Sequence, residues 1–269
     1  MPRVALCVSS DIENSSLPIN VARPGSSVTT VSSPRDRIRE HEPGRRAAAG
    51  KREVSRPART RAAWARETCG MSHDRDVQAF DDRAASYESG RRGRLHKEIS
   101  DRVVELCLSQ VPTPRRVLDV GCGTGYVLRQ LAVRLPQASE FLGVDAAPKM
   151  IEVARSASSD ERLNFVQGTA ERLPSGDRAY DLVVSTTSFD HWTDQAAGIR
   201  ECARALAPGG TLVLTDQFSN LLWPTMLGSR RGKARTRSRV TRLITAAGLR
   251  EPRWHPCYSV IIQSVTAVR

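Results

Sequence analysis

Residues 116–125, Arg-Val-Leu-Asp-Val-Gly-Cys-Gly-Thr-Gly, constrain the fold more than any other part of the chain. An apolar strand leads through an acidic residue, Asp119, directly into a loop with glycine at every second position. Glycine is needed where a backbone turns sharply and a ligand approaches it closely. The fingerprint of dinucleotide-binding enzymes would require a sixth-position glycine, but Tyr126 stands there. The run therefore predicts a strand, a tight loop and a helix, with either a different ligand or none.

The pattern of apolar residues beyond this loop alternates between strands and helices. Strands separated by helices predict an α/β fold with a mostly parallel sheet. The strands are expected at Arg116–Val120, Phe141–Val144, Leu163–Gln167, Asp181–Ser185, Thr211–Thr215, Arg253–Ser259 and Ile261–Val268. The helices are expected at Glu98–Val111, Tyr126–Leu135, Ala147–Ser156, Gln195–Leu206 and Ser238–Ala247, with a short helix or lid at Ala79–Tyr87.

A second acidic residue, Asp145, ends the strand that follows the glycine loop. A carboxylate at the tip of the second strand of such a fold can accept hydrogen bonds from both hydroxyls of a ribose. Taken alone, Asp145 would more often be the N-cap of the next helix. The glycine loop upstream favours the ribose interpretation.

These motifs, in this order, resemble the class I S-adenosylmethionine-dependent methyltransferases, and most closely the type 11 domain of ubiquinone- and menaquinone-biosynthesis enzymes. The resemblance runs from about Ala79 to Arg269. Besides the glycine loop it rests on residues 79–87 (AFDDRAASY), 164–174 (NFVQGTAERLP), 180–194 (YDLVVSTTSFDHWTD) and 207–214 (APGGTLVL). It implies a Rossmann-like, seven-stranded, mostly parallel sheet with helices on both faces.

The same resemblance implies S-adenosylmethionine as cofactor. Asp119 would suit its ammonium group, Met150 would pack on the adenine, and Tyr87 would arch over the methionine end. Thr169 stands where the family usually has an aspartate that accepts a bond from the adenine amino group, and a hydroxyl accepts this bond more weakly. The implied cofactor-binding residues are Asp119, Gly121, Cys122, Gly123, Thr124, Gly125, Asp145, Met150, Thr169, Ala170, Glu171, Ser185 and Tyr87.

Asp190 and His191 are the candidate catalytic residues, because the family often shows a His-His pair at this place. Methyl transfer from a sulfonium is a direct displacement, which needs alignment of the acceptor more than acid or metal assistance. A base helps only when the acceptor has a proton to lose, and a histidine with an unperturbed pKa near 6.5 suits that task. His191 is equally well explained as a packed or surface histidine.

The acceptor is expected to be a small molecule. Enzymes that methylate amino groups of DNA carry an Asn/Asp-Pro-Pro-Tyr segment after the fourth strand, where this chain has Ser185–Ser188. Seven basic residues between Arg230 and Arg242 leave an RNA methyltransferase as the alternative. They can clamp an anion or form a solvated loop. A catalytically silent cofactor-binding module is a further alternative.

Half of the formal charge of +12 lies in residues 1–70, which are rich in Ser, Pro, Arg and Ala. Such a segment cannot bury enough apolar surface to offset its ordering entropy. We therefore expect a disordered basic tail, or an extension upstream of a true start at Met71, followed by one domain over residues 71–269. We expect the tail to contribute nothing to folding or catalysis.

The six cysteines form no C-x-x-C pair, so neither a disulfide framework nor a zinc or other metal site is predicted. No apolar run approaches the 18 residues of a membrane-spanning helix. A reducing compartment, and hence the cytoplasm, is the expected location. The sequence carries no signal for the oligomeric state.

Overall fold

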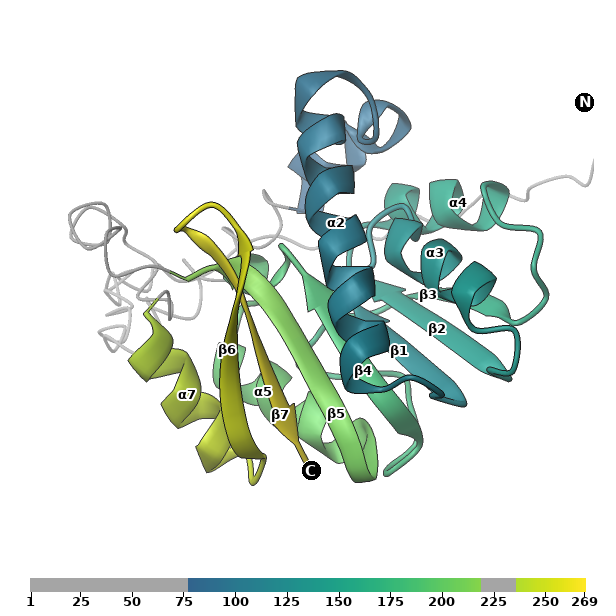
Figure 1. Cartoon of the computed structure of the whole chain (residues 1–269). Coiled ribbons are helices and arrows are strands. Elements are labelled where there is room, and N and C mark those ends of the chain that lie inside the picture. Colours follow the sequence, from purple (N-terminus) through teal and green to yellow (C-terminus); the bar gives the residue numbers. More distant parts are fainter. Residues whose placement is uncertain (1–76, 219–235) are drawn as a thin grey trace, which may run out of the picture. The chain divides into compact units, whose positions relative to one another are not determined.

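A computed structural model describes residues 77–218 and 236–269 of the chain (Figure 1). Residues 1–70, for which the sequence predicts a tail, and the basic positions 230–235 lie outside the described residues. No helix in these two described stretches is long and apolar enough to cross a membrane.

The described residues form a seven-stranded sheet with the order β3-β2-β1-β4-β5-β7-β6. The first five strands of this order are parallel, and β7 runs antiparallel to both β5 and β6. The strands are β1 (Arg116–Val120), β2 (Glu140–Asp145), β3 (Leu163–Gln167), β4 (Tyr180–Thr186), β5 (Leu206–Gln217), β6 (Arg250–Tyr258) and β7 (Ile262–Val268). The expected mostly parallel α/β sheet is confirmed.

Helices cover both faces of the sheet (Figure 1). They are α2 (Gly90–Gln110), α3 (Tyr126–Arg134), α4 (Pro148–Ser156), α5 (Gln195–Ala205) and α7 (Arg237–Ala246), with the short 3-10 helices η1 (Ala84–Ser86) and η2 (Phe189–His191). Residues 77–81 are also helical, so the expected helix or lid at Ala79–Tyr87 is two short turns.

The two cores show why the sequence folds this way. Along β4, Leu182 and Val184 pack with α2, α3 and α4, whereas Val183 packs with α5 and α7 on the other face. Strands buried on both faces read as continuous apolar runs, as these do. Successive side chains of each strand therefore supply two different cores.

Two elements begin five or more residues earlier than the sequence predicts. Helix α2 begins at Gly90 rather than Glu98. The chain before it turns so tightly that a Cβ on Gly93 would lie 2.2 Å from the backbone carbon of Glu88, so glycine is required there. Strand β5 begins at Leu206 rather than Thr211, because residues 207–210 form a bulge between the pairs Tyr180–Leu206 and Leu182–Thr211. Gly209 lies inside this bulge with a φ of 79°.

Replacing Gly125 by alanine is expected to destabilise the protein by roughly 2–4 kcal/mol. Gly125 caps α3 with a φ of 78°, and an added Cβ would lie 2.6 Å from the ring of Phe165, which is buried in the core. Gly209→Ala is the matched control, since its φ is 79° but its Cβ would meet nothing within 4 Å. Urea unfolding should show a loss of only about 1 kcal/mol for the control. Equal losses in the two variants would show that the contact with Phe165 is irrelevant.

Candidate functional site

A pocket of about 720 Å³, part of it open to solvent, lies at the carboxyl ends of the parallel strands. This edge is where ligands bind in open α/β sheets. Loops after β1, β2, β3 and β4 contribute to it, and so does the segment before α2. The lining residues are Val77, Phe80, Tyr87, Gly121, Gly123, Val144, Asp145, Ala146, Ala147, Met150, Gly168, Thr169, Ala170, Glu171, Thr186, Thr187, Ser188, His191 and Trp192.

The glycine loop is held in shape by Asp145. One carboxylate oxygen of Asp145 accepts the backbone N–H of Gly123 at 2.8 Å, and the other accepts the N–H of Ala147 at 2.9 Å. A carboxylate oxygen has a second lone pair, so both oxygens can still accept a bond from a ligand. On Gly121 a Cβ would lie 2.3 Å from the side chain of Ser188, which shows how closely the segment after β4 approaches the loop.

Two buried acids give this end of the pocket its electrostatic character. Burial raises the pKa of Asp119 to about 8, and the charge of Asp145 adds to the shift. Burial also raises the pKa of Asp145, although its bonds from Ala147 and Gly123 lower it. The two carboxylate oxygens of Asp119 have no hydrogen-bond partner among the described residues. A buried carboxylate without a partner is costly, and a cationic group would remove that cost.

An apolar wall faces the second acid. Met150 is 1% exposed and packs with Ala147 and with the lining residues Val77, Phe80 and Tyr87. Burial, followed by the charge of Asp145, raises the pKa of Tyr87 to about 12, so its hydroxyl stays neutral. A flat apolar group and a polar hydroxylated group could therefore be bound side by side.

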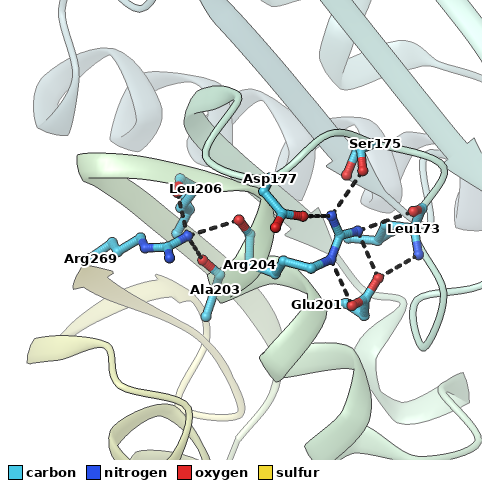
Figure 2. A network of polar contacts seen from close by, with 8 residues as sticks. All are labelled: Leu173, Ser175, Asp177, Glu201, Ala203, Arg204, Leu206 and Arg269. Carbon is cyan, nitrogen blue, oxygen red and sulfur yellow. Dashed lines mark hydrogen bonds and ion pairs between the residues drawn. The ribbon is translucent and has the colours of Figure 1, made fainter.

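The loop after β3 is anchored from behind by the polar network in Figure 2. The carboxylate of Glu201 on α5 accepts the N–H of Leu173 at 3.0 Å and pairs with the guanidinium of Arg204. Arg204 also donates to the carbonyls of Leu173 and Ser175 and to the carboxylate of Asp177. The guanidinium of Arg269 donates to the carbonyls that end α5 and begin β5. These bonds fix the loop whose preceding residues, Thr169, Ala170 and Glu171, line the pocket.

The side of the pocket formed by η2 carries His191. Its ring meets Phe80 edge-on, with centroids 4.9 Å apart and planes at 89°, and its backbone N–H donates to the carbonyl of Ser188. Asp190 does not line the pocket, and its backbone N–H donates to the buried carboxylate of Asp216 at 3.1 Å. Between the two catalytic candidates, the structure places only His191 at the pocket.

The structure brings together eight of the thirteen residues expected to bind the cofactor. Gly121, Gly123, Asp145, Met150, Thr169, Ala170, Glu171 and Tyr87 line one pocket. The other five are not among its lining residues. Asp119 and Cys122 are buried, Thr124 bonds to Glu88, Gly125 caps α3, and the hydroxyl of Ser185 is 2.8 Å from that of Ser188.

In the segment that follows β4, the sequence analysis named His191 but missed Thr187, Ser188 and Trp192, which also line the pocket. Ser188 donates to the carbonyl of Val120 at 2.9 Å and accepts the indole N–H of Trp192 at 3.3 Å, so it joins β1 to η2. Thr187 has a φ of 52°, a conformation that β-branched residues rarely adopt and that often marks a functional segment. The contacts of these residues are tertiary, and the sequence gives no local signal for them.

Comparisons with known proteins agree with this geometry. A family model described as "Methyltransferase domain" matches residues 118–214, which include the glycine loop, β2 to β4 and most of β1 and β5. Residues 118–214 are therefore similar to methyltransferase domains. S-adenosylmethionine is the cofactor that this domain implies. The residues present fit that cofactor: Asp145 and Met150 line the pocket, where a ribose acceptor and an apolar surface for adenine are needed. Asp119, two residues before the lining residue Gly121, is buried, and its carboxylate has no partner in the described part of the chain, so a cationic group would satisfy it.

Named relatives are similar to part of this chain in sequence, and a solved structure is similar to it in fold. A demethylmenaquinone methyltransferase of Deinococcus radiodurans is 41% identical over 106 residues, which are 39% of this chain and 44% of that protein. A malonyl-acyl-carrier protein O-methyltransferase of Legionella pneumophila is 32% identical over 150 residues, 54% and 51% of the two chains. The chain thus spans about half the length of the curated relatives it matches. An S-adenosylmethionine-dependent methyltransferase from Mesorhizobium loti shares the fold, with a TM-score of 0.52 and 20% identity over 62% of this chain and 95% of that one.

Proposed function

We propose that the protein transfers a methyl group from S-adenosylmethionine to a small-molecule acceptor. The observation that carries the proposal is the pocket itself, in which the acidic glycine-loop end and the side lined by His191 belong to one cavity. The relatives' names support a small acceptor, since one names a demethylmenaquinone and another a malonyl group. The four cysteines in the described part of the chain are free, which supports a reducing location such as the cytoplasm.

Different residues of the chain would bind the cofactor, exclude water and accept a proton. When bound, the cofactor supplies a methyl group bonded to a positively charged sulfur, and this sulfur is the leaving group when a nucleophile attacks the methyl carbon. Asp119 and Asp145 would hold its ammonium and ribose groups, and Met150 and Ala170 would lie against its adenine. Phe80, Tyr87 and Trp192 exclude water and fix the acceptor's approach. His191 accepts the acceptor's proton at a ring nitrogen, where the acceptor has one to lose.

The proposal is tested by offering labelled S-adenosylmethionine to the protein together with two separate acceptor pools, cellular metabolites and RNA. We expect label in a metabolite and none in RNA. Robust labelling of RNA that disappears when Arg237, Arg239 and Arg242 are replaced by serine would instead establish the alternative acceptor, because basic residues that neutralise phosphates carry such binding. Cofactor binding without transfer to either pool would establish a silent binding module.

A further inference from the structure

The residues just before α2 form a lid segment, residues 77–89, which contributes Val77, Phe80 and Tyr87 to the pocket. Nothing in the proposed chemistry explains how this segment is kept in place. Its aromatic rings contact each other loosely, with the centroids of Phe80 and Tyr87 6.4 Å apart. Besides the contact of Phe80 with His191, two carboxylates of the lid segment make hydrogen bonds to other elements, one to α4 and one to the glycine loop.

The first attachment joins the lid segment to α4. A carboxylate oxygen of Asp81 accepts the backbone N–H of Lys149 at 2.9 Å. Lys149 lies in the first turn of α4, where backbone N–H groups have no partner inside the helix. This bond therefore anchors the lid segment beside Met150, on the side of the pocket that follows β2.

The second attachment joins the lid segment to the glycine loop. One oxygen of Glu88 accepts the hydroxyl of Thr124 at 2.6 Å and a guanidinium N–H of Arg129 at 2.9 Å. Arg129 also donates to the carbonyl of Thr124, and the ammonium of Lys97 lies 3.8 Å from the other carboxylate oxygen. Thr124 stands between two glycines of the loop, so Glu88 is bonded directly to the segment that defines the cofactor site.

These contacts also keep Glu88 ionised. Burial alone would raise the pKa of Glu88, but the bonds from Thr124 and Arg129 and the charges of Arg129 and Lys97 outweigh it, and the pKa lies below its ordinary value. Hydrogen bonds that involve an ionised partner are about twice as strong as neutral ones. The attachment is thus a charged one at neutral pH.

We propose that Glu88 is a positioning residue that holds the lid segment closed on the glycine loop and so sets how long the cofactor stays bound. The proposal rests on the proposed function, in that the pocket must bind the cofactor. Glu88 does not line the pocket and acts through its neighbour Tyr87, which does. A ligand beneath a lid leaves only when the lid opens, so its dissociation rate rises with the open fraction.

The test measures association and dissociation of S-adenosylhomocysteine by stopped flow, using the full chain. Glu88→Ala should speed dissociation roughly tenfold and leave association within about twofold. Glu88→Gln keeps the size of the side chain and can still accept the Thr124 hydroxyl, so an intermediate increase is expected. Glu105→Gln is the matched control, because Glu105 lies on α2 and pairs with an arginine, Arg134, at 2.8 Å, away from the pocket lining.

The outcomes separate the two proposals. A wild-type protein that does not bind the ligand would overturn the proposed function and this inference together. Normal wild-type binding with the same dissociation rate in Glu88→Gln, Glu88→Ala and Glu105→Gln would overturn the inference alone. A merely structural role would lower the melting temperature of Glu88→Gln and slow its association, and this result would also contradict the inference.

Discussion

Replacing Asp119 by asparagine is expected to weaken binding of S-adenosylhomocysteine by roughly 10- to 150-fold, because bonds to a charged group contribute about 1.5–3 kcal/mol. Asp119 is 1% exposed, and its oxygens have no partner among the described residues. The ligand's ammonium group would be the missing partner. Calorimetry of the variant checks the loss. Asp101→Asn is the control, since Asp101 is an exposed acid that accepts the hydroxyl of Tyr126 at 2.8 Å outside the pocket.

The same substitution is expected to stabilise the ligand-free protein at high pH. The folded-state pKa of Asp119, about 8, lies above its unfolded value, so the folded state favours the protonated acid. This contribution of Asp119 to the free energy of unfolding, on the order of a few kcal/mol, is fully present below about pH 4. It is lost as the pH rises through about 8. Asparagine carries no charge at either end of this range. Its advantage over the wild type in melting temperature should therefore be larger at pH 8.5 than at pH 5, and an advantage that does not change with pH would contradict this account.

Replacing His191 by glutamine is expected to lower kcat by about 100-fold or more for an acceptor that loses a proton, the usual range for general-base catalysis. The KM for the cofactor should change by less than about threefold, because the residues that hold the cofactor are elsewhere in the pocket. The reason is placement: His191 lines the pocket beside Phe80. Steady-state kinetics with the acceptor identified from the metabolite pool provides the measurement.

Asp190→Asn is the matched variant for this prediction. Asp190 precedes His191 in η2 but does not line the pocket, and its bond to Asp216 is made by its backbone N–H, which the substitution keeps. We expect kcat within about fivefold of the wild type. If both variants lose activity equally, the geometry of η2 matters rather than the imidazole, and the assignment of His191 as the base is wrong.

The sequence predicts the cofactor-binding residues of the pocket better than the residues on the proposed acceptor side, and the reason is physical. Strand β1, its glycines and Asp145 are local patterns in which burial, turn geometry and a strand-end acid each leave a mark on the sequence. Ser188 and Trp192 reach the pocket only because the segment after β4 folds back against Gly121. Likewise, the bond between Glu88 and Thr124 joins residues 36 positions apart. Such contacts depend on tertiary packing, so they leave no periodic pattern or fixed spacing in the sequence.

Asp119 shows a different limit of sequence reasoning. Its position before the glycine loop predicted an ammonium partner, but in the structure Asp119 is buried and is not among the lining residues. The acid is therefore separated from open solvent. Only the structure reveals that burial and the neighbouring Asp145 raise its pKa, and thus that ligand-free and ligand-bound proteins should differ in the charge they carry there.

Calorimetric titration of the folded full chain with S-adenosylhomocysteine tests the central claim most directly. Binding at one site is predicted, and the carboxylate of Asp119 should become more fully ionised on binding because a cation lowers the pKa of an adjacent acid. At pH 7.5 the titration should accordingly release protons to the buffer, which two buffers of different ionisation enthalpy reveal, and Asp119→Asn should release fewer. Absence of binding to a protein whose circular dichroism shows that it is folded would contradict the account.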